Sequence, residues 1–454
     1  MMKEANIKLF NVIVLGLVFL LVFSGFNTLA GIQHLILNSA KDQESGGYVE
    51  GFYGNGLWSL ATIFMVHTVA NWIAPSVIAV TGPRLALFLG AAIFGLFKAQ
   101  LLVLNTELLY ASSALLGIGA AVLWTAQGNY LAQNSDEDTI SRNSGIFWAM
   151  LNCSGLIGHI FVYFQFRGNK DIDSETRTMV VTVLMCMATA GTFVVTFLRP
   201  TPWTQHEAKK SPLQALKDSF KLFFKQDMLM LSFTFLYTGI KLNICFALYG
   251  TCIGFTNAFG TESKGLTNLA GIFTAIGEVL SSTILGLFGK RTSATGRKPI
   301  IILGFVVSMV AYLLIFLNLP NECPLGETDP AETAIIPSNK YLAVLAGFLL
   351  GFSDAIFNTQ AITILGSVFA EESASAFMIY KFLQSLAASA AFWYSPVLKL
   401  YWQLLIATTI NVANATCLWL VEKKIQQDKS KNIKTTSDNT AEITNYGMEI
   451  EESF

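Results

Sequence analysis

Charged side chains are scarce in this sequence. Asp, Glu, Lys and Arg make up only 13% of its 454 residues, whereas a typical soluble protein carries roughly a quarter. Hydrophobic residues make up 53%, and a soluble chain this apolar would expose large aggregation-prone patches. The formal net charge is −1, which leaves no basic excess for nucleic acid. The composition therefore disfavours a cytosolic enzyme, a disordered chain and a nucleic-acid-binding protein.

Residues that build metal centres and active sites are also sparse. The chain has six cysteines and four histidines, and no pair of cysteines has metal-ligand spacing with a histidine nearby. The sequence contains no glycine-rich phosphate loop, no His-Glu-x-x-His motif and no Gly-x-Ser-x-Gly motif. We therefore expect no bound metal, no cofactor and no enzymatic activity.

Long apolar runs are what the sequence has in abundance. A helix that spans a membrane needs about 20 apolar residues. Twelve runs qualify, bounded by charges, proline or glycine, and they predict an all-α membrane protein with twelve transmembrane helices embedded in a lipid bilayer. The predicted spans are Leu9–Ala30, Phe52–Val80, Leu85–Leu104, Leu108–Ala132, Ser144–Phe166, Thr178–Leu198, Met228–Phe255, Leu266–Phe288, Ile300–Leu319, Tyr341–Phe369, Ala374–Leu398 and Tyr401–Val421.

Basic residues are distributed unevenly between the loops on the two sides. If the N-terminus is inside, 19 of the 29 Lys and Arg fall in inside segments, 7 in outside loops and the other three within spans. Cytosolic loops of membrane proteins carry the excess of Lys and Arg. Both termini are therefore predicted to face the cytosol, in either the plasma membrane or an endolysosomal membrane.

The longest inside loop divides the predicted spans into two sets of six. We expect a six-helix half over residues 1–198, a cytosolic linker over 199–227, a second six-helix half over 228–421 and a disordered polar tail over 422–454. Within the linker, Leu213–Phe224 repeats apolar residues at helical spacing beside lysines. This segment is either an amphipathic helix on the inner leaflet or a plain linker helix.

Four charged residues fall inside the spans of the second half. Lys241 lies 13 residues into span seven and Glu278 lies 12 residues into span eight, which at 1.5 Å per residue places both roughly 20 Å from their starting interfaces, near the midplane. An ion pair between them is therefore predicted. Asp354 lies near the midplane of span ten, with Asn358 one turn on, and Lys381 lies nearer the cytosol. Such residues form either a substrate or proton-coupling site or a set of structural ion pairs.

Polar and aromatic residues take the corresponding place in the first half. Trp124, Gln127 and Asn129 are candidates for a surface that binds a small or neutral ligand. The alternative is routine hydrogen bonding between membrane helices. Lys98, in span three, is expected to extend outward with its charge near the interface.

An acidic turn precedes span five on the side that otherwise favours positive charge. Asp136 and Glu137, with Arg142 nearby, are candidates for a cytosolic gate. Capping of the helix N-terminus by the carboxylates is the simpler interpretation, and the two overlap.

Several stretches carry a resemblance to a known family. The sequences AVLWTAQGNY at 121–130, NSDE at 134–137 and RNSGIFW at 142–148, with TGP at 81–83 and DAIFNTQ at 354–360, resemble the Unc-ninety-three-like branch of the major facilitator superfamily. The resemblance covers nearly the whole chain except the tail. One departure lies in the first cytosolic turn, where Pro75 and Ala79 replace the usual glycine and aspartate, and this puts ordinary transporter gating in doubt.

The resemblance implies both a fold and a choice of functions. In the superfamily, spans one, four, seven and ten line a central cavity, so Lys241 and Asp354 would face it and Glu278 and Lys381 could reach it. The first function implied is a secondary transporter of an unknown small solute. The second is a non-transporting partner that regulates an ion channel or escorts a membrane receptor.

Overall fold

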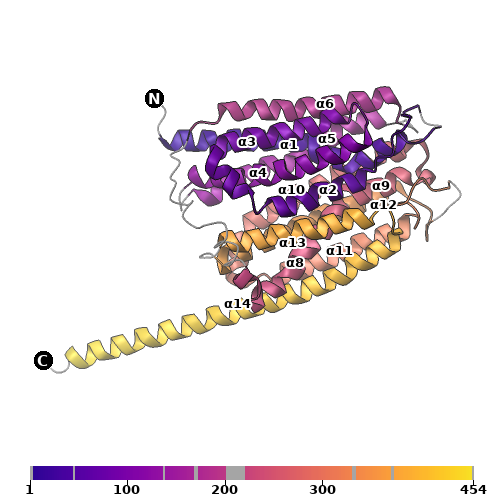
Figure 1. The fold of residues 1–454 in the computed structure, drawn as a ribbon. Helices are drawn as coiled ribbons and strands as arrows, with labels where there is room; N and C mark the ends of the chain where they lie inside the picture. Colours follow the sequence, from indigo (N-terminus) through magenta and orange to yellow (C-terminus); the bar gives the residue numbers. More distant parts are fainter. Residues whose placement is uncertain are drawn as a thin grey trace.

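The computed structural model describes residues 4–43, 46–135, 139–167, 172–200, 220–329, 334–369 and 373–451. Helices and loops make up all of this described part, which contains no β-strand. The helices lie side by side in one bundle (Figure 1). Ten of the described helices are long and apolar enough to cross a membrane, and α2 is a shorter apolar helix. The all-helical membrane architecture is therefore confirmed, whereas the count of twelve spans stays a prediction.

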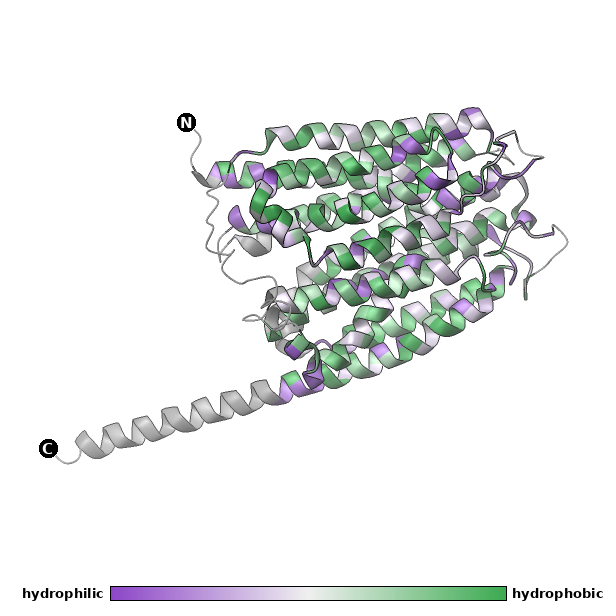
Figure 2. Cartoon of the chain, in the orientation of Figure 1, coloured by the Kyte–Doolittle hydropathy of each residue, from purple (hydrophilic) through white to green (hydrophobic). Residues whose placement is uncertain are grey.

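The main helices follow the predicted apolar runs closely. Their bounds are α1 Glu4–Ser39, α2 Gly56–Ala70, α3 Ala74–Gln100, α4 Thr106–Gln133, α5 Ile140–Phe166, α6 Ser174–Val194, α8 Gln226–Asn243, α9 Tyr249–Phe255, α10 Ser263–Thr295, α11 Lys298–Asn318, α12 Lys340–Val368, α13 Ser373–Tyr394 and α14 Leu400–Glu451. Hydrophobic residues cover most of their length, and hydrophilic residues gather toward the two ends of the bundle (Figure 2). This distribution is what a bilayer requires of helices that cross it.

Side-chain caps start several helices in the loops. Asn55, Asn105 and Asn339 accept hydrogen bonds from backbone N–H groups in the first turns of α2, α4 and α12. Asp173 does the same for α6, and its hydrogen bond with Thr176 lowers the pKa of the Asp173 carboxyl. Asn and Asp are favoured at this position because a helix leaves its first N–H groups without internal partners.

The second predicted span, Phe52–Val80, is not one continuous helix. α2 ends at Ala70, and α3 begins at Ala74 after a short turn. Pro75 lies in the first turn of α3, where its ring cannot clash with a preceding helical turn. α3 then bends at Gly82, whose φ of +74° favours glycine. Residues 81–84, which separate the second and third predicted spans, therefore lie at a kink inside α3.

The end of the chain also differs from the expected disordered tail. α14 continues as one helix to Glu451 and extends beyond the bundle (Figure 1). Residues 422–446 contain neither proline nor glycine, so nothing in this stretch interrupts the helix. α1 begins and α14 leaves the bundle at the same end (Figure 1). Most of the predicted amphipathic segment Leu213–Phe224 lies outside the described residues.

Buried hydrophobic side chains form two clusters. The first draws almost wholly on residues 12–198, and the second on residues 222–421. Inside the second, α10 packs along α12, where a Cβ atom at Gly347 would lie 2.8 Å from the carbonyl oxygen of Ala270. The clusters meet where α2 packs against α13 and α5 packs against α10.

Candidate functional site

Lys241 on α8 has no exposed surface. Its ammonium group donates hydrogen bonds to the hydroxyls of Ser353 on α12 and Ser308 on α11, the latter at 3.4 Å. The rings of Tyr237 and Phe357 lie 5.8 and 5.9 Å from the same nitrogen. Lys241 is therefore held by hydroxyls and aromatic faces, without a carboxylate in ion-pair contact among the described residues.

The predicted ion pair between Lys241 and Glu278 is not formed. Lys241 turns to the two serines, and Oε1 of Glu278 has no hydrogen-bond partner in the described part of the chain. Lys241, Glu278 and Asp354 do act on one another electrostatically. Spacing along a helix predicts depth, but the rotation of each helix decides which side chains touch, and this explains the difference.

Asp354 on α12 begins a chain of hydrogen bonds that ends at Lys381 on α13. Its Oδ2 accepts a bond from Asn358 at 2.9 Å, whereas its Oδ1 has no partner among the described residues. The amide oxygen of Asn358 accepts bonds from Tyr380 at 2.7 Å and Gln384 at 3.2 Å. The Lys381 ammonium donates to Gln384 at 2.9 Å and lies 4.8 Å from the Tyr380 ring. Lys381 is thus linked to Asp354 through the neutral amides of Gln384 and Asn358.

Sequence reasoning missed four members of this network: Ser308, Ser353, Tyr380 and Gln384. Gln384 follows Lys381 by three residues, a spacing that places both on one helix face. Ser353 directly precedes Asp354. Ser308 carried no local signal, because its role depends on packing between α8 and α11.

A π-helical segment also went unpredicted. Ile244–Leu248 connects α8 to α9, directly after Asn243, whose side chain donates a hydrogen bond to Ser395 at 2.9 Å. The segment packs against Gly31 of α1, where a Cβ atom would lie 3.3 Å from the carbonyl oxygen of Phe246. Single π-helical turns occur frequently at functional sites, and this one begins three residues after Lys241.

Aromatic rings fill the interior of the first cluster. Trp124 lies with its ring centroid 5.1 Å from that of Phe19, 5.2 Å from that of Phe23 and 6.0 Å from that of Trp148. Phe147 lies 5.0 Å from Phe19. The structure therefore places predicted Trp124 inside a packed aromatic cluster. Of the other two candidates on α4, Gln127 is buried and Asn129 is half-buried.

The candidate gate cannot be placed in full. Asp136 and Glu137 lie outside the described residues. Arg142 lies in the first turn of α5, and its side chain is likewise outside the described part. The gate therefore stays a prediction.

Stacked rings join α2 to α13. The Trp58 and Trp393 centroids are 5.5 Å apart, and the Trp58 indole N–H donates to the Trp393 carbonyl at 3.2 Å. Phe64 stacks on Phe392 at 5.3 Å. Ser389 donates a hydrogen bond to the Ala61 carbonyl at 2.9 Å. On the other side of the bundle, His159 of α5 meets Asn268 of α10 at 3.2 Å.

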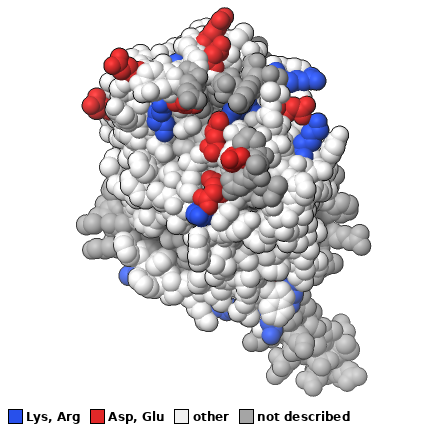
Figure 3. Space-filling model, turned by 90° about the vertical axis from the view of Figure 1, so that its right-hand side faces the viewer, with Lys and Arg blue, Asp and Glu red and all other residues white. Residues whose placement is uncertain are grey.

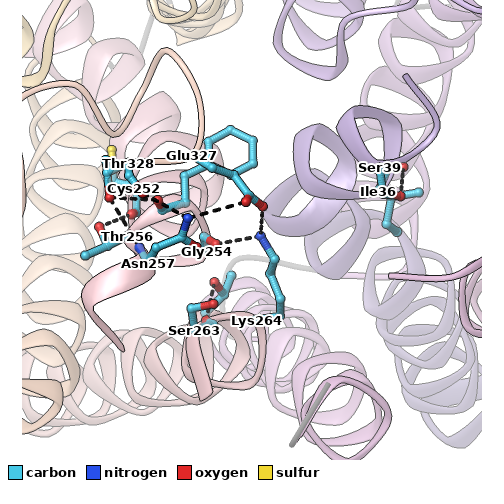
Figure 4. A network of polar contacts seen from close by, with 12 residues as sticks. Ile36, Ser39, Cys252, Gly254, Thr256, Asn257, Ser263, Lys264, Glu327 and Thr328 are labelled. Carbon is cyan, nitrogen blue, oxygen red and sulfur yellow. Dashed lines mark hydrogen bonds and ion pairs between the residues drawn. The ribbon is translucent and has the colours of Figure 1, made fainter. Parts of the chain in front are cut away.

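A polar network connects the loop between α11 and α12 to neighbouring residues at one end of the bundle (Figure 4). The Lys264 ammonium lies 2.7 Å from Glu327 and 2.7 Å from the Gly254 carbonyl. Thr328 donates its backbone N–H to the Phe255 carbonyl at 2.9 Å. In the view onto this end, acidic and basic side chains gather in the upper part, and most of the coloured surface below them is uncharged (Figure 3).

A buried ion pair lies beyond the expected end of the last span. Glu422 accepts hydrogen bonds from the Arg297 backbone N–H at 2.9 Å and from its guanidinium at 3.1 Å. Glu422 is 2% exposed and Arg297 is 4% exposed. Nearby, Lys424 contacts Asp227 at 2.8 Å. Glu422 is therefore part of the folded bundle, contrary to its assignment to a disordered tail.

Lys98 does not extend outward as expected. Its side chain is fully buried, and the ammonium donates to the Phe94 carbonyl at 3.0 Å. Gly25 of α1 leaves room for it, because a Cβ atom there would lie 2.8 Å from Lys98 Cε. The missing side chain at Gly25 gives the reason for the inward turn.

The family follows from comparison with known proteins. Residues 52–419 match the family described as ion channel regulatory protein UNC-93. The chain belongs to the UNC-93 family. It is 38% identical to the UNC93-like protein MFSD11 of Xenopus laevis over 94% of this chain and 98% of that protein. It is 25% identical to protein unc-93 homolog A of Homo sapiens over 91% of this chain and 93% of that protein.

Solved structures show the fold of this UNC-93 family member. The nucleoside transporter NupG matches with a TM-score of 0.62 and 15% identity, over 92% of this chain and 99% of that chain. The peptide transporter POT in complex with sulfate matches with a TM-score of 0.60 and 11% identity, over 94% of this chain and 99% of that chain. The chain is a multi-pass membrane protein with the major facilitator fold, as the resemblance implied.

Proposed function

We propose that this UNC-93 family member is a secondary transporter that moves a small solute by alternating access and performs no enzymatic reaction. The observation that carries the proposal is the set of charged residues inside an apolar bundle: Lys241 and Asp354 are buried, Lys381 is half-buried, and each is hydrogen-bonded to polar side chains. Charges within membrane helices are costly and usually mark a substrate or ion pathway. The fold that the chain shares with two transporters supports this function.

The proposed topology has twelve spans. α2 and α13 are the two beyond the ten long apolar helices, and α8 with α9 counts as one. The halves are residues 1–198 and 228–421, joined by the linker 199–227, with 422–454 and both termini in the cytosol. The two hydrophobic clusters and the common end of α1 and α14 support this division (Figure 1).

In the proposed mechanism Asp354 is the coupling residue. Asn358 fixes the orientation of its carboxylate, and Lys241, Glu278 and Lys381 set the electrostatic surroundings. A carboxylate with one unpartnered oxygen can take up and release a proton as the halves rock. Trp124, Gln127 and Asn129 would form the N-terminal wall of the site. Asp136, Glu137 and Arg142 would form the cytosolic gate.

One observation favours a second function, regulation of a partner membrane protein such as a channel or receptor. The family is described as ion channel regulatory, and ring-on-ring packing both fills the first cluster and joins α2 to α13. A protein that does not rock can keep such packing permanently. In that case the partner would bind on the lipid-facing surface, away from Asp354.

Proteoliposomes with a pH-sensitive dye inside test the two functions together. A panel of small solutes is added to vesicles holding wild-type protein or Asp354→Asn, which is nearly isosteric. Transport predicts solute-dependent proton movement that the variant loses while its folded yield is kept. The regulator predicts no proton movement and unchanged recovery of partners by proximity labelling. If Asp354→Asn abolishes folded protein, Asp354 is structural and the coupling assignment is wrong.

A further inference from the structure

The charges of Lys241, Glu278, Asp354 and Lys381 are not equally satisfied by their neighbours. Lys241 has two serine hydroxyls as acceptors, and Lys381 has the Gln384 amide oxygen and the Tyr380 ring. Both cations therefore have neutral partners close by. The carboxylates do not match this arrangement.

Each carboxylate has an oxygen atom that accepts no hydrogen bond from the part of the chain that the structure describes. Asp354 is 8% exposed, and only its Oδ2 accepts a hydrogen bond within the described ranges. Oε1 of Glu278 is likewise buried without a partner there. A buried acceptor without a donor raises the free energy of the fold, and a buried charge does so more strongly. Residues that keep such an unfavourable free energy in the fold are candidates for binding a ligand that supplies the missing donor.

The helices that carry the two carboxylates, α10 and α12, pack closely against each other beside both residues. A Cβ atom at Gly277, next to Glu278, would collide with the Phe348 carbonyl oxygen of α12. The charges of Glu278 and Asp354 act on one another. A ligand that carries both positive charge and N–H donors would satisfy both oxygens. An anion would be repelled. A neutral donor would leave the carboxylates without a cation in direct contact, because Lys241 and Lys381 donate to Ser353 and Gln384 instead.

We propose that the solute accepted at this site is a small organic cation whose primary ammonium group binds Asp354 Oδ1 and Glu278 Oε1. This inference rests on the proposed transport function and names its substrate class. Metal ions such as Mg²⁺ and Ca²⁺ take six or more oxygen ligands. No group of three His, Cys, Asp or Glu that could hold a metal ion occurs among the described residues. Two oxygens suit the three donors of an ammonium group better.

An ammonium group and a proton would compete for the same oxygens. Binding of an amine should therefore weaken as the pH falls and the carboxylates become protonated. The two events together give exchange of a proton for the cation across the membrane. No covalent bond forms or breaks in this exchange, and one positive charge replaces another at the carboxylates.

Thermal unfolding of the purified full-length protein tests binding without any need for transport. The probes are methylamine, butylamine and 2-phenylethylamine, each beside the alcohol and the carboxylate with the same carbon skeleton. At least one amine should raise Tm by about 2–4 °C at saturation, more at pH 8 than at pH 5. The matching alcohol and carboxylate should not. Equal shifts with all three classes, or no shift with any amine, overturn the proposal.

Variants then locate the site. Asp354→Asn and Glu278→Gln should each abolish the amine-specific shift, whereas Glu262→Gln should keep it, because Glu262 pairs with Lys340 at an exposed position. An undiminished shift in both site variants would place the amine elsewhere. If a variant does not fold, the wild-type comparison still decides. A Tm shift with an amine but no proton movement in vesicles would contradict the transport function alone. Proton movement driven only by neutral solutes would contradict the organic-cation substrate alone.

Discussion

Phe19, Phe23 and Trp124 pack ring against ring in the N-terminal helices. The interior of the C-terminal helices instead holds Lys241 and Asp354, each hydrogen-bonded to polar side chains of its own. The first arrangement is a packed aromatic interior, beside which Lys98 is fully buried with its ammonium on the Phe94 carbonyl. The second keeps charges inside a bilayer-sized bundle, where they are expensive. Under the proposed transport function, this contrast divides the work: the N-terminal helices would supply a packed wall and the C-terminal helices the coupling charges.

The largest expected effect on stability comes from the buried Arg297–Glu422 ion pair at one end of the C-terminal helices. Glu422→Ala leaves Arg297 buried without its carboxylate, and breaking a buried ion pair costs roughly 3–5 kcal/mol in soluble proteins. Folded yield and Tm should fall strongly. The matched control is Asp227→Asn, which breaks the more exposed pair with Lys424 and should cost below about 1 kcal/mol. Equal losses in both variants would show that burial of the Arg297–Glu422 pair is irrelevant.

In the aromatic interior, the stability of the protein should depend on the size of the side chain at position 124. Trp124→Ala removes the ring that touches Phe19, Phe23 and Trp148, and should cost up to about 3 kcal/mol, the lower end for buried aromatics because Trp124 is only half-buried. Trp124→Phe should restore most of the stability. If Trp124→Phe instead changes the pH dependence of uptake as strongly as Asp354→Asn does, the contrast between an aromatic interior and a charged interior is contradicted.

The charged interior should show coupling between residues that do not touch. Lys241→Met and Glu278→Gln each unbalance the cluster, and the double variant should recover stability of the order of 1 kcal/mol relative to additive losses. A thermal-unfolding cycle of the four proteins measures this directly. Strictly additive changes would mean that the electrostatic link between Lys241 and Glu278 has no energetic consequence.

The smallest expected effect is at the exposed end of the bundle. Glu327→Gln removes the charge opposite Lys264 but keeps an acceptor, and Glu327 is 37% exposed. The cost should therefore lie below about 1 kcal/mol. Hydrogen exchange should speed up only in the loop between α11 and α12. Faster exchange throughout α10 and α12 would show that the Lys264–Glu327 pair supports more than this loop.

Much of the fold was predictable, because long apolar runs leave a membrane helix as the main solution. The break before Pro75 was not predicted, because the apolar run Phe52–Val80 is long enough to look like one span. The proline itself was the signal that could have placed it. Depth along a helix was enough to single out Lys241, Glu278 and Asp354.

What the sequence could not supply was the rotation and contact of helices. The partnership of Lys241 with Ser308 and Ser353, and the inward turn of Lys98 toward Gly25, depend on neighbours distant along the chain. The π-helical turn at Ile244–Leu248 has no compositional signal of its own. Glu422 was misassigned because its buried partner Arg297 precedes it by 125 residues.

The most direct test compares Asp354→Asn with Trp124→Phe in matched proteoliposomes across a series of imposed pH gradients. Both substitutions conserve shape closely enough to keep the protein folded. If the C-terminal interior performs coupling, Asp354→Asn abolishes gradient-driven proton movement, and Trp124→Phe changes its rate while keeping its pH dependence. If both variants keep that pH dependence, or if Trp124→Phe alone loses it, the assignment of coupling to the C-terminal interior is contradicted.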